Sequence, residues 1–265
     1  MDSSTKSSLW LEICRSREDW DEFLEICGRE FVHSSLAQRY LPNLEKRKKL
    51  IPEYFRYIYD KLYSDERAIL SILKTDRGED GKNLANAKII IGWIFRCNFT
   101  TRPVDTSRMF EIYSKGTEIL LKRDQWVVEH IHEPIKKAAD NMGLLPLYPG
   151  RIAVRSEYKK TKIMTDYTHE AAFLMMKELE TRNGSTKRGY LLYWVIIDTL
   201  SGARKLMSSW GLTEVAHLHY DFKPGLKCCE NPTVKEEKDV SCHFVFVQRS
   251  MASSLRSYFQ QRSSL

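Results

Sequence analysis

The feature that most constrains the fold of this chain is a strand, a polar turn and a long helix that follow one another past its midpoint. Ile152–Val154 is apolar, residues 155–160 are polar, and a helix is predicted from about Thr161 to Glu180. A second apolar strand at Tyr190–Ile197 and a second helix at Ser201–Trp210 follow. Strands that alternate with helices favour a mixed α/β fold, in which a central twisted sheet carries helices on both faces.

The rest of the chain continues this alternation. Ser16 resembles a helix N-cap, Pro134 predicts a break or kink after His132, and Gly143 is well placed to end that helical stretch. The other predicted elements are an edge strand at Trp10–Ile13, helices at about Arg17–Glu30 and Tyr54–Tyr63, strands at Ala68–Lys74 and Lys88–Cys97 around a hairpin loop at Asp76–Asn86, a helical region at Arg108–Met142, and strands at Glu214–Phe222 and Ser241–Gln248.

Length and composition allow a full hydrophobic core. With 265 residues, 42% of them hydrophobic, we expect one domain over residues 9–249, with flexible tails at 1–8 and 250–265. The longest apolar runs are strand-sized and the first residues carry no apolar signal region, so we expect a soluble, cytoplasmic protein without membrane contact. Oligomeric state is left open.

Six cysteines show no metal-ligand or disulfide spacing, so we interpret them as reduced, mostly buried thiols and predict no metal. Lys and Arg outnumber Asp and Glu by 42 to 35, a net charge of +7 that suits an anionic small molecule as well as nucleic acid. The densest basic run, Lys46–Lys49, has no RNA-binding signature around it, and we interpret it as a solvated helix face or loop. Nucleic acid is therefore not the favoured partner.

The turn after Val154 has the chemistry of an anion site. A strand that enters a helix through a short polar turn directs unpaired backbone N–H groups and the positive end of the helix dipole to one place. Lys159, Lys160 and Lys162 add positive charge. Because the dipole disfavours lysine at a helix N-terminus, three lysines here indicate a nearby anion.

Three segments carry a resemblance to a known family. Ala153–Met164 resembles the V-x-P-x-Y-R-G-x-G-I-G/A segment of the GCN5-related N-acetyltransferases, and Ser201–Leu206 followed by Trp210–Leu212 resembles the family's later helix with its L-G-F ending. Glu30–Leu36 resembles the F-F-x-x-E-P-L segment of the insect-type arylalkylamine N-acetyltransferases. The resemblance extends from about Trp10 to Arg249.

The resemblance implies acetyl-coenzyme A (acetyl-CoA) as cosubstrate. It assigns cofactor binding to ten residues: Ile152, Ala153, Val154, Lys159, Lys160, Thr161, Lys162, Ile163, Met164 and Arg204. Lys160, Lys162 and Met164 stand where the family has small residues, mainly glycine, that let the backbone approach the pyrophosphate. Either the lysine side chains hold the ligand further out, or the turn no longer binds it.

The resemblance also implies direct acetyl transfer to an amine, with a backbone N–H of Ile152–Val154 stabilising the oxyanion. Ser34 or Ser35 replaces the glutamate base of the insect-type branch, so the candidate bases are His33 and then Glu30. Ser201 is the candidate polar contact to the cofactor or the leaving thiolate. A role as a helix N-cap would by itself explain the presence of this serine.

Two histidines are further candidates for an acceptor pocket, and the sequence allows more than one function. His130 and His132 could line an acceptor pocket, although core or surface roles are the simpler interpretation. The favoured function is acetyl-CoA-dependent N-acetylation of a small primary, arylalkyl-type amine. The alternatives are a catalytically impaired module that binds an acyl-CoA or another anion, and a nucleic-acid-associated protein.

Overall fold

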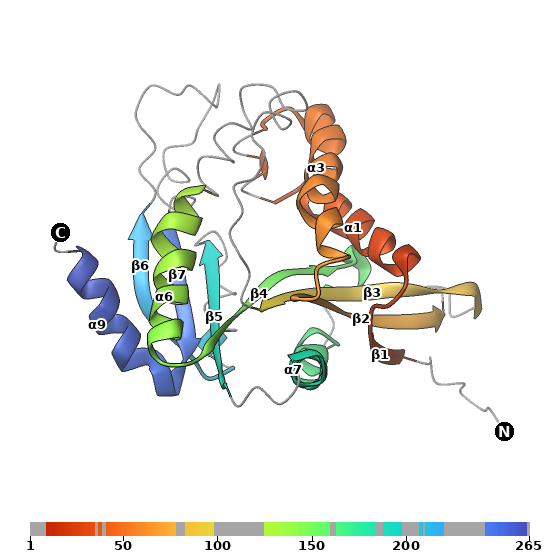
Figure 1. The fold of residues 1–265 in the computed structure, drawn as a ribbon. Helices are drawn as coiled ribbons and strands as arrows, with labels where there is room; N and C mark the ends of the chain where they lie inside the picture. Colours follow the sequence, from red (N-terminus) through yellow and green to blue (C-terminus); the bar gives the residue numbers. More distant parts are fainter. Residues whose placement is uncertain are drawn as a thin grey trace. The chain divides into compact units, whose positions relative to one another are not determined.

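The structure, a computed structural model, describes residues 9–34, 37–38, 41–77, 83–97, 125–159, 163–183, 188–197, 207–208, 210–219 and 242–263. Within these residues, seven strands follow the order β1-β2-β3-β4-β5-β7-β6 (Figure 1). β4 and β5 pair in parallel, whereas β1–β2, β2–β3, β5–β7 and β6–β7 pair antiparallel. The predicted α/β class with a mixed sheet is confirmed.

The strands are β1 Leu9–Ile13, β2 Ala68–Arg77, β3 Asn83–Cys97, β4 Leu145–Val154, β5 Tyr190–Ile197, β6 Leu212–His219 and β7 Cys242–Gln248. The helices are α1 Arg17–Phe31, α3 Leu44–Tyr59, α6 Glu133–Asn141, α7 Ile163–Asn183 and α9 Ala252–Ser263. Short helical turns are η1 Asp60–Leu62, η2 Val128–His132, η3 Ser156–Tyr158 and η4 Arg249–Met251.

The chain divides into two compact units. The first unit contains Met1–Phe31, Ile51–Arg96 and Pro149–Thr186, and the second contains Val32–Leu50, Cys97–Tyr148 and Lys187–Leu265. β4 therefore begins in the second unit and ends in the first.

The first unit has helices on both faces of its strands. On one face, Phe23 of α1 packs so closely on Gly92 of β3 that a Cβ at residue 92 would lie 2.2 Å from the ring. On the other face, Tyr167 of α7 contacts Ser71 of β2, with 2.9 Å between the two side-chain oxygens and a further hydrogen bond to the Ser71 carbonyl. Figure 1 shows α1 and α7 on opposite sides of β2 and β3.

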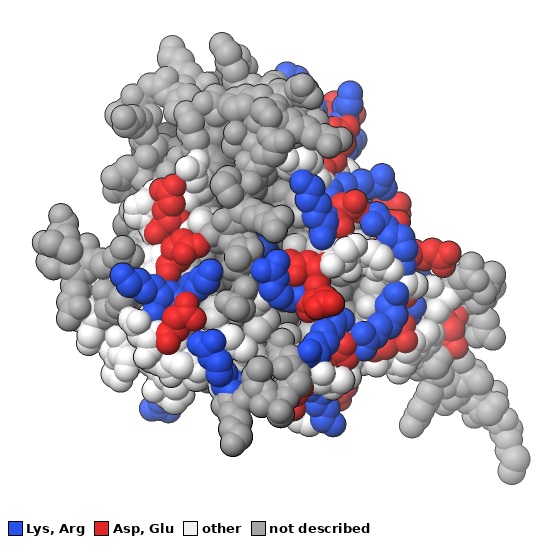
Figure 2. Space-filling view, in the orientation of Figure 1, with Lys and Arg blue, Asp and Glu red and all other residues white. Residues whose placement is uncertain are grey.

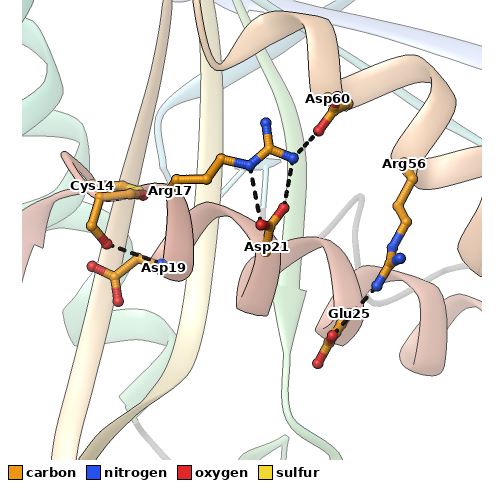
Figure 3. Close-up of polar contacts among 8 residues, drawn as sticks. Cys14, Arg17, Asp19, Asp21, Glu25, Arg56 and Asp60 are labelled. Atoms are coloured by element: carbon orange, nitrogen blue, oxygen red, sulfur yellow. Dashed lines mark hydrogen bonds and ion pairs between the residues drawn. The ribbon is translucent and has the colours of Figure 1, made fainter.

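Ion pairs join α1 to α3 and to the turn after it. Arg17 binds the carboxylates of Asp21, one helical turn further along, and of Asp60 in η1. Arg56 of α3 binds Glu25 at 3.4 Å (Figure 3). These exposed pairs contribute little stability. The end of α1 packs on the middle of α3 instead, where a Cβ at Gly28 would lie 2.9 Å from the Pro52 Cα and the ring centres of Phe31 and Phe55 are 5.0 Å apart.

The second unit has its own hydrophobic core between β5, β6, β7, α6 and α9. Ile135 and Ala139 of α6, Val245 and Val247 of β7 and Leu255 of α9 are all inaccessible to solvent. The expectation of a flexible C-terminal tail is wrong, because this segment forms η4 and α9. Leu255 and its apolar neighbours recur at helical spacing and complete the core.

Several element boundaries differ from the prediction. The predicted loop at Asp76–Asn86 is too wide, because β2 continues to Arg77, which pairs with Asn83. β4 begins at Leu145, earlier than expected, and includes Pro146 and Pro149. The predicted helix at Ser201–Trp210 lies mostly outside the described residues.

Three local predictions concern helix ends and breaks. The Ser16 hydroxyl accepts the backbone N–H of Asp19 at 3.0 Å, so the predicted N-cap is confirmed. Pro134 does not end the helical stretch; a π-helical segment, η2, precedes it, and α6 starts at Glu133. Gly143, at φ 69°, ends α6 as predicted.

The basic run at Lys46–Lys49 is a helix face, but it is not wholly solvated. Arg47 is buried and donates at 2.8 Å to the carbonyls of Leu41 and Pro42. Its guanidinium therefore binds the segment that precedes α3 instead of facing solvent. The interpretation of this run as a solvated face is wrong for Arg47.

Candidate functional site

The end of β4 is fixed by contacts to β3 and α1. The Arg155 backbone N–H donates to the Ile90 carbonyl at 3.0 Å, and its guanidinium donates to the Ile89 carbonyl and to the Glu22 carboxylate, each at 2.5 Å. Glu22 also accepts the Ile89 N–H at 3.0 Å. The chain therefore leaves the sheet in one defined direction, and the turn that follows is held in place.

The turn after β4 binds an anion, and that anion is a carboxylate of the protein. The Ser156 backbone N–H donates to Glu30 Oε1 at 3.2 Å, and Lys159 Nζ lies 2.6 Å from Glu30 Oε2. Arg29 Nε lies 3.4 Å from the same carboxylate, whose side chain is only 8% exposed. A backbone N–H group and a lysine side chain of the turn after β4 thus both contact one carboxylate in the last turn of α1.

Of the predicted cofactor-binding residues, the structure describes Ile152, Ala153, Val154, Lys159 and Ile163. Ala153 and Val154 are buried in the sheet, Lys159 is exposed, and Ile163 begins α7. The remaining predicted residues, which are Lys160, Thr161, Lys162, the Met164 side chain and Arg204, lie outside the described part of the chain.

The three catalytic candidates have different positions. Glu30 is held against the turn, as described above. His33 is exposed on the turn after α1, and its backbone carbonyl accepts the Gln38 side-chain amide at 2.8 Å. Ser34, one of the two residues at the position of the family's glutamate, accepts the Ala37 N–H and so has a local capping role. Ser201 lies outside the described residues.

Arg151 of β4 is a charged residue that packs against α1 and α3 and that sequence reasoning did not single out. Its guanidinium carbon lies 5.0 Å from the ring centre of Phe31, at the end of α1, and 5.8 Å from that of Phe55 in α3. Burial raises the pKa of the Tyr59 hydroxyl, while the Arg151 charge and a hydrogen bond from it oppose that rise. The available signal was a single charge inside the otherwise uncharged β4 sequence.

His132, in the second unit, is a buried polar group. Its Nδ1 lies 2.8 Å from the Tyr193 hydroxyl, and its ring contacts Tyr148 at a centroid distance of 4.7 Å. Tyr148 and Tyr193 directly follow the last β4–β5 register pair, Leu147 with Leu192. His132 therefore sits where the parallel register of these strands ends, whereas His130 is exposed and donates from Nδ1 to the Trp126 carbonyl.

Three observations concern surface charge, membrane spans and metal ligands. On the face shown in Figure 2, Lys and Arg of the described residues are interspersed with Asp and Glu. No helix in the described part of the chain combines the length and the apolarity that a membrane crossing requires. Among the same residues, no group of three or more His, Cys, Asp and Glu side chains could hold a metal ion.

The fold is that of the GCN5-related N-acetyltransferases, as the resemblance in sequence predicts. The chain is similar to the C-terminal condensation domain of Ebony in complex with beta-alanyl-dopamine, with a TM-score of 0.56 and 11% identity. It is also similar to mosquito arylalkylamine N-acetyltransferase like 5b, with a TM-score of 0.50 and 14% identity. Each likeness covers 91% of this chain and 99% of the other. No protein-family model and no curated protein matches the sequence.

Proposed function

We propose that the protein is an acyl-CoA-dependent N-acetyltransferase that passes an acetyl group directly to a small primary amine of the arylalkyl type. The observation that carries the proposal is the anion held at the end of β4 by the Ser156 N–H and Lys159. In the resemblance noted above, this turn is where the pyrophosphate of the cosubstrate binds. The two structural neighbours, one in complex with beta-alanyl-dopamine and one named for arylalkylamines, support an amine as acceptor.

The residues of the turn fit a phosphate group. Phosphate oxygens need N–H donors and positive charge, and the Ser156 N–H and Lys159 supply both to the Glu30 carboxylate. Lys160 and Lys162, at two glycine positions of the family, would add side-chain charge in place of close backbone approach. We therefore assign the phosphates of the cosubstrate to Ser156, Lys159, Lys160 and Lys162.

When bound, the cosubstrate supplies an acetyl group activated as a thioester. The backbone N–H groups of Ile152–Val154 would stabilise the negative charge that develops on the acetyl oxygen as the amine attacks. Glu30 or His33 would accept the amine proton while the new C–N bond forms and the C–S bond breaks. Ser201 would donate a hydrogen bond to the departing thiolate.

One observation favours the alternative, a binding module without catalysis: Ser34 or Ser35 stands where the resemblance places the glutamate base. The Glu30 carboxylate occupies the donors that a phosphate would use in either function. In the alternative, an anionic ligand displaces Glu30 and binds, but no acetyl transfer follows. Transfer assays separate the two functions.

The test is a thermal-shift titration with acetyl-CoA, followed by an acetyl-transfer assay on a panel of amines. At a hundred times its Kd, a ligand stabilises the folded protein by about 2.7 kcal/mol. The double variant Lys159→Ala, Lys162→Ala should bind acetyl-CoA more weakly, whereas Lys137→Ala, an exposed lysine of α6, should not. An unchanged melting temperature in millimolar acetyl-CoA refutes both functions, and binding without transfer to any amine leaves only the alternative.

A further inference from the structure

The contacts that hold Glu30 at the turn after β4 are mostly long. Lys159 Nζ lies 2.6 Å from Glu30 Oε2, whereas the Ser156 N–H and Arg29 Nε contact Oε1 at 3.2 and 3.4 Å. Charge-assisted hydrogen bonds are normally about 2.7–2.9 Å long, so of these three contacts only that of Lys159 is short. The Lys159 side chain is half exposed, and solvent weakens such an ion pair. Another anion can therefore compete with Glu30 for these donors.

Glu30, and not the neighbouring Glu157, is the carboxylate that such an anion would replace. Glu157 uses other donors, because it accepts from the Ser156 hydroxyl at 3.3 Å and lies 4.0 Å from Lys88. Glu30 stands in the last turn of α1, where the helix dipole disfavours a negative charge. A phosphate group carries more negative charge and more acceptor oxygens than one carboxylate, so the donors of the turn favour the exchange.

The held position also keeps Glu30 from acting as a base. Its side chain is only 8% exposed, and both of its oxygens already accept contacts, Oε1 from Ser156 and Arg29 and Oε2 from Lys159. A general base must bring an acceptor oxygen within about 2.6–3.2 Å of the group whose proton it removes. An amine would have to approach an oxygen that is buried and occupied. Glu30 can therefore accept the amine proton only after it has left the turn.

We propose that Glu30 is an autoinhibitory residue: it blocks the turn and is itself shielded until it is exchanged for the phosphates of acetyl-CoA, and its release supplies the base. This inference rests on the proposed acetyltransferase function and adds a regulatory contact to it. The released carboxylate attracts an amine that arrives as a cation. Binding at the turn should therefore strengthen binding of the amine, and by linkage the amine should strengthen binding at the turn.

The release of Glu30 is measurable without acetyl transfer. The full chain is treated with a water-soluble carbodiimide and glycine ethyl ester, either alone, with inorganic pyrophosphate or with CoA, and peptide mass spectrometry compares the labelling of Glu30 with that of Glu25. Glu25 lies on the same helix and its side chain is 67% exposed, so the ratio corrects for reagent that the phosphates consume. The Glu30 to Glu25 ratio should be low in the ligand-free protein and should rise at least about three-fold with each probe that calorimetry shows to bind.

Two results of this experiment overturn the inference alone. One is an unchanged ratio with a bound probe, which would mean that Glu30 stays at the turn. The other is equal labelling of Glu30 and Glu25 in the ligand-free protein, which would mean that Glu30 is not shielded. The comparison uses only the wild-type protein, so it stands even if a variant folds poorly.

Isothermal titration with tyramine measures the coupling between the turn and the amine. Saturating CoA should tighten tyramine binding by the wild-type protein at least about five-fold. Glu30→Gln should abolish this increase, whereas Glu25→Gln, which removes the same charge from an exposed position of α1, should retain it. An increase that is absent from the wild type, or that persists in Glu30→Gln, overturns the coupling. If neither CoA nor acetyl-CoA binds, the proposed function fails, and this inference fails with it.

Discussion

Replacing Glu30 by glutamine is the most informative single change, because it separates two roles of this carboxylate. The Glu30 side chain is 8% exposed and binds the Ser156 N–H at 3.2 Å and Lys159 Nζ at 2.6 Å. Glutamine retains an oxygen for Ser156 but removes the negative charge. Lys159 then becomes available to another anion, and only a neutral amide oxygen competes for the Ser156 N–H.

The expected magnitudes follow from these distances. Two unit charges about 4 Å apart interact by about 1 kcal/mol in water and about 4 kcal/mol near a protein surface. Since the Lys159 side chain is 50% exposed, we take the lower end, ~1 kcal/mol. Glu30→Gln should therefore tighten acetyl-CoA binding about five-fold. Loss of the ion pair should lower the free energy of unfolding by about 1 kcal/mol and the Tm by about 2 to 4 °C.

Isothermal titration with acetyl-CoA measures the affinity, and steady-state turnover measures catalysis. If Glu30 is also the base, kcat should fall by about 10²-fold or more although the cosubstrate binds more tightly. Glu25→Gln is the matched control, because Glu25 lies on the same helix, pairs with Arg56 and is exposed. Weaker or unchanged acetyl-CoA binding by Glu30→Gln would refute the idea that this carboxylate occupies the place of the ligand.

Three further predictions concern stability and thiol chemistry. Gly92→Ala should lower the free energy of unfolding by about 2 to 3 kcal/mol in urea titrations, because the new Cβ would meet the buried Phe23 ring. A hydrogen bond from Arg15 lowers the pKa of Glu178 from 4.5, so Glu178→Gln should destabilise by about 0.5 kcal/mol at pH 7, and this difference should vanish as the pH falls below the lowered value. Burial raises the pKa of Cys97 to about 11, so its alkylation by iodoacetamide at pH 8 should be slow in the folded protein and fast in urea, as measured by peptide mapping.

Each of these has a contradicting outcome. A Gly92→Ala protein as stable as wild type would mean that Phe23 moves aside without cost. A Glu178→Gln deficit that does not shrink as the solution is acidified would show that packing, not charge, is lost. Equal alkylation rates of Cys97 in native and unfolded protein would show that the thiol is accessible.

Much of the fold could be predicted because hydrophobic periodicity indicates the order of the strands and helices along the chain. β5 and the start of α1 follow apolar patterns that local chemistry alone explains, including the Ser16 cap. The early start of β4 was missed because Pro146 and Pro149 normally argue against a strand. The prediction missed α9 because its composition is polar. Its buried residues Ala252, Leu255 and Phe259 nevertheless recur at helical spacing.

The candidate site was predictable only in part. The turn after β4 follows from a strand, polar residues and a helix in sequence, and Lys159 was correctly placed there. Its partner Glu30 is distant in the chain, and nothing in either segment specifies that a carboxylate would fill the turn. Arg151 was missed for the same reason, because its aromatic neighbours come from α1 and α3 and meet it only in the folded unit.

The π-helical segment η2 has a consequence for how this chain tolerates length changes. A π turn corresponds to one additional residue within a helix, and each residue of an α-helix rotates the side chains by about 100°. Deleting one residue from Val128–Ile131 would let an ordinary α-helix form, but it would turn His132 away from the Tyr193 hydroxyl. The extra residue of η2 therefore sets the direction of a buried histidine, and its removal should cost that hydrogen bond.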